Sequence, residues 1–277
     1  PAVDLPPTFP ARVAAFACDL DRTLIAEDAV LRPRTAAAIA GVRNAGAHVI
    51  VVTGRMFRSV RPYLEQAQLT EPVICYQGAV VADPPSGEFL RHVPIPRERA
   101  LEAIDAVTAA GFHVNCYLDD MLYVAEVTQE ARAYADFQHI EIHAVGDLRA
   151  WLDRDPTKLV AVGDPAALDE LEADLKPRFR GRLYVSKSLP YFLEFAHPSV
   201  SKGAGLEYVA RRLGFGPEET VACGDGENDR ELLDWAGFGV AVANAHADVL
   251  ARADLVVPSV DEEGVAALLE SYLDSLA

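Results

Sequence analysis

The chain has 277 residues, 51% of them hydrophobic, so it can bury the core of one large domain or two moderate ones. A formal net charge of −17 argues against a nucleic acid polymer or an anionic membrane as partner, because both require a basic face. No apolar run approaches the length of a membrane span, and the first residues lack the layout of a secretory signal. We therefore expect a soluble cytoplasmic protein, and we leave its oligomeric state open.

The first part of the chain alternates apolar strands with helical segments. Residues 13–18 are expected to form a strand, and residues 31–46 a helix with Pro33 near its first turn. A second strand over residues 47–53 follows, and then a helix over 56–69 that leads to a strand at 72–76. Continuous apolar strands joined by helices are typical of a parallel sheet that is covered on both faces.

The same alternation returns near the end of the chain. An amphipathic helix is predicted over residues 201–214, and it is followed by strands and helices in turn. The later strands are expected at residues 220–224, 238–242 and 255–257, and the later helices at 229–237, 246–253 and 262–276.

The middle of the chain has a different pattern. One hairpin is predicted over residues 80–93 with its turn at 84–87, and a second over 112–126 that turns at Asp119 and Asp120. Helices at residues 97–111 and 165–179 are interleaved with these hairpins. We therefore predict an α/β fold in which residues 1–82 and 195–277 form a doubly wound parallel sheet. Residues 83–194 are predicted to be an inserted α+β domain.

Four polar segments follow the predicted strands or open a helix, namely residues 19–23, 53–55, 201–203 and 224–229. Ligands of a doubly wound sheet bind beyond the carboxyl ends of its strands, so these segments are expected to converge on one cleft. The cleft would contain several aspartates but no histidine or cysteine pair, and such an oxygen-rich set suits Mg²⁺. With Lys202, the metal would form a positive centre for a phosphate group, whose oxygens Thr53 and Asn228 could also bind.

The order of these segments, D-x-D-x-T, T-G-R, a lysine before a helix and G-D-G-E-N-D, resembles the haloacid dehalogenase superfamily. In particular, it resembles the Cof-like branch of sugar-phosphate and cofactor phosphatases, and the likeness extends over nearly the whole chain. The resemblance implies a Rossmann-like core. It also implies that the inserted segment is a cap, which excludes water from the cleft and recognises the leaving group.

The resemblance also implies a role for each matching residue. Asp19 would be the nucleophile that forms an aspartyl-phosphate, and Asp21 would be the general acid and then the general base. The other implied roles concern the phosphate and the metal. Leu20, Thr53, Gly54, Lys202 and Asn228 would bind the phosphoryl group, whereas Asp19, Asp21 and Asp225 would ligate Mg²⁺, with Asp229 orienting the metal shell from one layer out.

The expected function is an Mg²⁺-dependent phosphomonoester hydrolase. Its partner would be a small phosphorylated metabolite, either a sugar phosphate or a cofactor or nucleotide phosphate. A phosphotransferase or phosphomutase could use the same aspartyl-phosphate chemistry and is the alternative. A phospho-receiver domain also uses Asp, Thr and Lys, but it needs neither a second Asp two residues after the first nor an inserted domain.

Several residues have an ordinary structural explanation. Taken singly, each aspartate could serve a turn or a helix cap, and only their joint order favours catalysis. Arg22 replaces a frequent glycine of the family, and we expect its side chain to point away from the metal site. Arg55 is equally compatible with a salt bridge and with a substrate contact, whereas Gln77 stands where the family often has Asn. His246 is expected at a helix start, and Cys18, Cys75, Cys116 and Cys223 are expected to be buried thiols.

Overall fold

The computed structural model describes residues 2–277, apart from the side chains of residues 130, 133 and 137. It consists of two compact units. Unit 1 comprises the chain up to Arg55, Val60–Leu90 and Ser201–Ala277, and unit 2 comprises Met56–Ser59 and Arg91–Val200. The domain limits expected from the sequence, at residues 83 and 194, stay a prediction.

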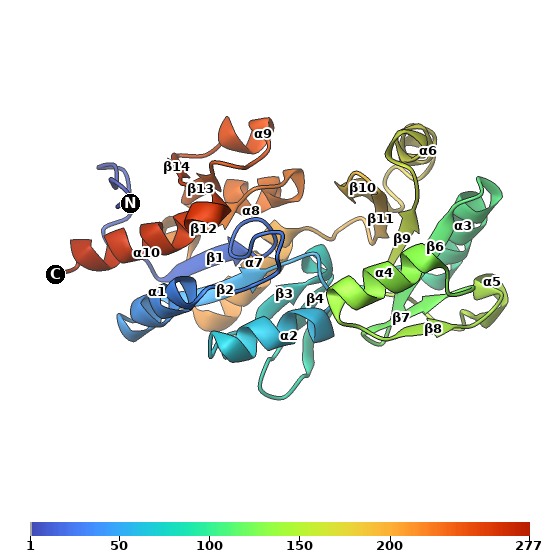
Figure 1. The fold of residues 1–277 in the computed structure, drawn as a ribbon, viewed down its shortest axis with the longest axis horizontal. Coiled ribbons are helices and arrows are strands. Elements are labelled where there is room, and N and C mark those ends of the chain that lie inside the picture. Colours follow the sequence, from blue (N-terminus) through green and yellow to red (C-terminus); the bar gives the residue numbers. More distant parts are fainter. Residues whose placement is uncertain (1) are drawn as a thin grey trace. The chain divides into compact units, whose positions relative to one another are not determined.

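Unit 1 is built on an eight-stranded sheet with the order β14-β13-β12-β1-β2-β3-β4-β5. Figure 1 labels its strands β1 to β4 and β12 to β14. Neighbouring strands from β14 to β3 run parallel, whereas β3 and β4 are antiparallel. The strands are β1 (Ala15–Asp19), β2 (His48–Val52), β3 (Val73–Cys75), β4 (Val80–Ala82), β5 (Phe89–His92, whose last two residues belong to unit 2), β12 (Thr220–Gly224), β13 (Phe238–Val242) and β14 (Leu255–Val257).

Helices cover both faces of this sheet, which explains why its central strands are mostly apolar, with polar residues only at their ends. On one face, the ring of Phe16 in β1 packs edge-on against Tyr272 of α10, with 5.3 Å between the ring centroids. On the other face, Ala15 and Ala17 share an apolar core with residues of α7 and α8. The helices of unit 1 are α1 (Pro33–Asn44), α2 (Phe57–Gln66, whose first three residues belong to unit 2), α7 (Lys202–Leu213), α8 (Arg230–Trp235), α9 (Ala247–Leu250) and α10 (Gly264–Ser275), with short 3₁₀ turns at Tyr76–Gly78, Pro217–Glu219, Glu227–Asp229 and Val260–Glu262.

The helix that carries the predicted lysine begins and ends where the sequence indicated. The Ser201 side chain accepts a hydrogen bond of 3.0 Å from the backbone N–H of Ala204, which caps the N-terminus of α7. Gly214 ends the helix in the left-handed conformation, with φ 82°. These two local signals fix Lys202 as the first residue of α7.

Unit 2 contains a second sheet of six strands with the order β10-β11-β9-β6-β7-β8. All its neighbouring strands are antiparallel except β7 and β8, and α3, α5 and α6 contribute to the apolar core on one face of the sheet. Asp119 and Asp120 form the predicted turn, both with left-handed φ angles, 52° and 57°. The elements are α3 (Arg97–Ala109), β6 (His113–Leu118), β7 (Met121–Val124), α4 (Gln129–Gln138), β8 (Ile142–Ala144), α5 (Leu148–Trp151), β9 (Lys158–Val162), α6 (Pro165–Arg178), β10 (Tyr184–Leu189) and β11 (Phe192–Ala196).

The first predicted hairpin, around residues 84–87, joins β4 to β5 and extends the sheet of unit 1. Its turn is closed by a hydrogen bond of 2.8 Å from the N–H of Asp83 to the carbonyl of Glu88. The predicted fold class, a doubly wound parallel sheet with an inserted α+β segment, is confirmed. Among the helices of the described residues, none has the length and apolar character needed to cross a membrane.

Candidate active site

The predicted site residues of unit 1 lie at the carboxyl ends of three neighbouring parallel strands. Asp19 is the last residue of β1, Thr53 directly follows β2, and Asp225 directly follows β12. The register pairs Asp19 with Val52 and Cys18 with Cys223, so these three ends lie side by side. The sequence patterns therefore converge on one edge of the sheet, as a doubly wound fold requires.

Lys202 is the cation that links two of the aspartates. Its Nζ lies 2.5 Å from Oδ1 of Asp19 and 2.6 Å from Oδ1 of Asp229, and its side chain is only 1% exposed. Burial alone would lower the pKa of Lys202, but the two carboxylates raise it above its ordinary value, so the ammonium stays charged. A buried charge of this kind is stable only because it is fully paired.

Asp229 holds the loop that follows β12. Its Oδ2 accepts hydrogen bonds from the backbone N–H groups of Asp225 (2.9 Å) and Gly226 (3.0 Å), while its Oδ1 is bonded to Lys202. A side chain at Gly224 would place its Cβ 2.6 Å from the Asp229 side chain, which explains the glycine before Asp225. Both Asp229 oxygens are engaged by the protein, so this residue orients its neighbours.

Three buried carboxylates can hold a cation. One side-chain oxygen from each of Asp19, Asp225 and Asp229 lies within 4.8 Å of the other two. Burial, and then the charge of Asp229, raise the pKa of Asp19 well above its ordinary value, and Lys202 offsets only part of this effect. Burial and Asp229 also raise the pKa of Asp225 to about 6. Lys202 and the half-exposed Arg22 supply two positive charges for three close carboxylates, and a divalent cation with oxygen ligands fits this donor set.

Arg22 and Thr23 both contact Asp225. The Thr23 hydroxyl donates to Asp225 Oδ1 at 3.4 Å, and Arg22 Nε lies 3.4 Å from Asp225 Oδ2. The expectation that the Arg22 side chain points away from the metal site is therefore wrong. Arg22 adopts a left-handed backbone with φ 64°, and this turn directs its half-exposed side chain back toward the loop after β12. No local sequence pattern specifies that direction.

Asp21 is held by Arg55 through two hydrogen bonds. Arg55 Nε donates to Asp21 Oδ2 at 2.8 Å, and Arg55 Nη2 donates to Asp21 Oδ1 at 2.5 Å. The Arg55 guanidinium also lies over the ring of Tyr63, 5.4 Å from its centroid, and its side chain is 4% exposed. The sequence left a salt bridge and a substrate contact open for Arg55, and the structure contains the salt bridge. The partner of Arg55 is Asp21, the residue that is expected to transfer protons.

The residues expected to bind phosphate belong to the same edge. The Thr53 hydroxyl oxygen accepts from the N–H of Arg55 at 3.1 Å, which leaves its hydrogen for another acceptor. Asn228 Nδ2 donates to Gln77 Oε1 at 3.0 Å. A side chain at Gly54 would place its Cβ 2.5 Å from Gln77 Nε2, so Gly54 makes room for this contact.

Leu20 is 1% exposed, and its carbonyl oxygen accepts from the N–H groups of Leu24 and Ile25, at 2.9 Å each. These bonds fix the tight turn after β1, from which Asp21 and Arg22 project.

Gln77 accepts a hydrogen bond from Asn228, a contact that the sequence analysis did not predict. Tyr76 and Gln77 are both buried, and both have left-handed φ angles, 51° and 59°. Such a pair is uncommon for residues other than glycine and is typical of a loop that is held by its surroundings. The sequence offered one indication that Gln77 belongs to the site, namely its position before Gly78, where the family often has Asn.

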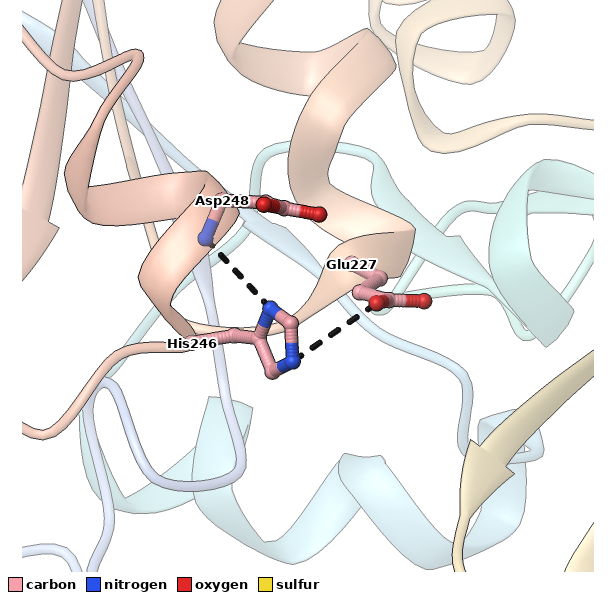
Figure 2. A group of neighbouring side chains, drawn as sticks. All are labelled: Glu227, His246 and Asp248. Atoms are coloured by element: carbon pink, nitrogen blue, oxygen red, sulfur yellow. Dashed lines mark hydrogen bonds and ion pairs between the residues drawn. The ribbon is translucent and has the colours of Figure 1, made fainter.

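Figure 2 shows a second, exposed group, which consists of Glu227, His246 and Asp248. Nδ1 of His246 accepts from the backbone N–H of Asp248 at 3.4 Å, and Nε2 lies 3.6 Å from Oε1 of Glu227. Both ring nitrogens of His246 therefore have a partner within the protein. His246 begins α9, as expected from the sequence.

The four cysteines are free and buried, as expected. Burial raises the pKa of Cys116 to about 12, so this thiol is unreactive.

The fold and the site define a class of protein: an α/β protein with a buried cluster of carboxylates and a lysine at the carboxyl edge of a parallel sheet. The sequence profile of the haloacid dehalogenase-like hydrolases matches residues 16–269. The chain belongs to this family, which confirms the resemblance noted in the sequence.

Named relatives cover nearly the whole chain. The 5-amino-6-(5-phospho-D-ribitylamino)uracil phosphatase YitU of Bacillus subtilis is 28% identical, over 93% of this chain and 96% of its own. The pyridoxal phosphate phosphatase YbhA of Escherichia coli is 27% identical, over 93% and 98%. The crystal structure of TM0651 from Thermotoga maritima has a TM-score of 0.82 at 30% identity, over 93% of this chain and 97% of that one. The expected enzyme class, a phosphatase, is confirmed.

Proposed function

We propose that this protein is an Mg²⁺-dependent phosphatase that hydrolyses a small phosphorylated metabolite through an aspartyl-phosphate on Asp19. The main support for the proposal is the position of Asp19 beside Lys202, whose Nζ lies 2.5 Å from Oδ1 of Asp19. Asp19 also lies among carboxylates that fit a divalent cation. The named substrates of the relatives, a phosphoribitylamino-uracil and pyridoxal phosphate, support a small cofactor-type or sugar-type phosphate as substrate.

In the first step, Asp19 attacks phosphorus. Lys202 binds Asp19 Oδ1, so Oδ2 is the oxygen that forms the new bond to phosphorus. The bond between phosphorus and the leaving oxygen breaks, and Asp21 gives this oxygen a proton. When bound, Mg²⁺ would be held by Asp19, Asp225 and the Asp21 carbonyl, and it would neutralise charge on the phosphoryl group.

In the second step, Asp21 takes a proton from water, which attacks phosphorus and releases inorganic phosphate and free Asp19. Arg55 suits the second step, because its two hydrogen bonds hold the Asp21 carboxylate in one orientation as a proton acceptor. In the first step one Asp21 oxygen carries the proton that it gives to the leaving oxygen, so the Arg55 hydrogen bond to that oxygen is released. The Thr53 hydroxyl and the free N–H of the Asn228 amide are available to the phosphoryl oxygens. Gln77 supports this arrangement because it occupies the other N–H of that amide.

The proposal is tested with p-nitrophenyl phosphate and a panel of phosphorylated metabolites, in Mg²⁺ and in EDTA. We expect hydrolysis only with Mg²⁺, and we expect Asp19→Asn to lose at least 10³-fold in kcat, because no nucleophile replaces the carboxylate. The exposed Asp174→Asn is the matched control and should retain full activity. Undiminished turnover by Asp19→Asn would refute the role of Asp19. Phosphate transfer to added alcohols in preference to water would favour a phosphotransferase.

A further inference from the structure

Arg22 lies next to the cation site but is not explained by the reaction. Its backbone is fixed from both sides: its N–H donates to the carbonyl of Ile25 at 2.7 Å, and its carbonyl accepts from Asn244 Nδ2 at 2.9 Å. Asn244 is itself anchored, because its Oδ1 accepts from the N–H of Val260 at 2.8 Å. The left-handed backbone that these bonds impose suits glycine better than arginine. A reason for arginine at this position must therefore come from its side chain.

The side chain of Arg22 places a positive charge on a residue that is expected to bind the metal. Nε lies 3.4 Å from Asp225 Oδ2, and Nη2 donates to the carbonyl of Asn244 at 3.3 Å. The Thr23 hydroxyl occupies Asp225 Oδ1 at 3.4 Å. Both oxygens of Asp225 thus have a donor from the protein itself, and one of these donors is cationic.

Arg22 completes a pattern in which every carboxylate of the site has a cation from the chain. Lys202 binds Asp19 and Asp229, and Arg55 binds Asp21. The Arg22 contact differs from the other two in its exposure. The Arg22 side chain is 48% exposed, whereas those of Lys202 and Arg55 are 1% and 4% exposed. Arg22 is therefore the cation of the three that can leave its carboxylate for solvent at little cost.

We propose that Arg22 is the counter-ion of Asp225 in the metal-free protein and that it lowers the affinity of the site for its divalent cation. The proposal rests on the proposed function, because it takes Asp225 as a metal ligand. A divalent cation at Asp225 must replace the guanidinium contact, and it then lies near a like charge. The repulsion between partly exposed charges is modest, so we expect Arg22 to weaken Mg²⁺ binding on the order of fivefold.

The test is calorimetric titration of the full-length protein with MgCl₂, without substrate. Arg22→Gln removes the charge but keeps a long polar side chain, and its Kd for Mg²⁺ should be on the order of fivefold lower than that of the wild type. Arg22→Lys keeps the charge and should stay within about twofold of the wild type. High salt should reduce the difference between Arg22→Gln and the wild type, since it screens the exposed charge.

Arg211→Gln is the matched control for net charge. Arg211 is in the last turn of α7, its side chain is 69% exposed, and it pairs with Glu207 on the same helix. This variant loses the same charge as Arg22→Gln but at the far end of the helix from Lys202, so its Kd should match the wild type. An equal gain in Mg²⁺ affinity for Arg211→Gln would overturn the proposal, because the effect would then come from net charge.

A second measurement keeps the two proposals apart. Circular dichroism confirms that Arg22→Gln is folded, and the shift in thermal midpoint on adding Mg²⁺ should be larger for this variant than for the wild type. If the wild type binds Mg²⁺ and hydrolyses phosphate esters but Arg22→Gln binds Mg²⁺ no more tightly, the role of Arg22 is wrong and the proposed function stands. If the wild type neither binds Mg²⁺ nor hydrolyses the esters, both proposals fail.

Discussion

Replacing Asp225 with Asn is expected to stabilise the metal-free protein at neutral pH. Burial, followed by the charge of Asp229, raises the pKa of Asp225 from 3.8 to about 6. Each pH unit between these values corresponds to about 1.4 kcal/mol, so keeping Asp225 ionised costs the folded protein about 3 kcal/mol. Asn has nearly the same shape and is never ionised, so the variant avoids this cost.

The effect has a defined sign with pH. The folded protein protonates Asp225 near pH 6, whereas the unfolded chain does so near 3.8. Between these values the folded state binds more protons than the unfolded chain, and the stability gained from this is lost as the pH rises through about 6. The advantage of Asp225→Asn should therefore be complete at pH 8, fall to about 1 kcal/mol at pH 4.5 and disappear below the unfolded value of 3.8.

The assay is urea unfolding in EDTA, followed by the fluorescence of tryptophan, since Trp235 lies on α8 of unit 1. Asp174→Asn, which removes an exposed carboxylate, is the control and should change the free energy of unfolding by less than about 0.5 kcal/mol. With Mg²⁺ the order should reverse, because the metal stabilises only a protein that binds it. If Asp225→Asn is no more stable than the wild type at pH 8 in EDTA, the argument from burial is wrong.

Three further substitutions test the packing and polar contacts of the site. Gly78→Ala should destabilise the protein by roughly 3 kcal/mol or more in urea unfolding. The reason is that Gly78 has φ 100° and a Cβ would lie 2.0 Å from the carbonyl oxygen of Ser201. A variant as stable as the wild type would mean that the loop can move. Lys202→Met should lower the free energy of unfolding by about 3–5 kcal/mol at pH 8, since it leaves two buried carboxylates without their cation. An equally large decrease at pH 5 would contradict this reason. Gln77→Leu should raise the KM for a phosphate ester roughly fivefold, because Asn228 loses the acceptor that orients its amide. Gln77→Glu keeps an acceptor, so its KM should stay near that of the wild type. Equal KM values for the wild type and both variants would contradict the role of Gln77.

Local sequence patterns were sufficient for the architecture. The strand of residues 220–224 has an apolar centre, which is typical of a parallel strand covered on both faces, and all five of its residues are buried. Ser201 and Gly214 mark the ends of α7 because capping depends on neighbouring residues in the chain. Once the strands are known to be parallel, their polar carboxyl ends must meet at one edge.

The partners of the individual carboxylates needed the tertiary structure. Arg55 was compatible with a surface salt bridge or a substrate contact, and only the fold brings its guanidinium to Asp21, 34 residues earlier in the chain. Arg22 was expected to point away from the site, but a left-handed turn that Asn244 stabilises from a distant loop directs it to Asp225.

The sequence by itself thus determined which residue types gather at the edge of the sheet, because periodicity, caps and motif order are local properties of the chain. The tertiary structure decided which cation neutralises which carboxylate. That choice depends on loop conformations and side-chain directions that are set by contacts between residues far apart in the sequence.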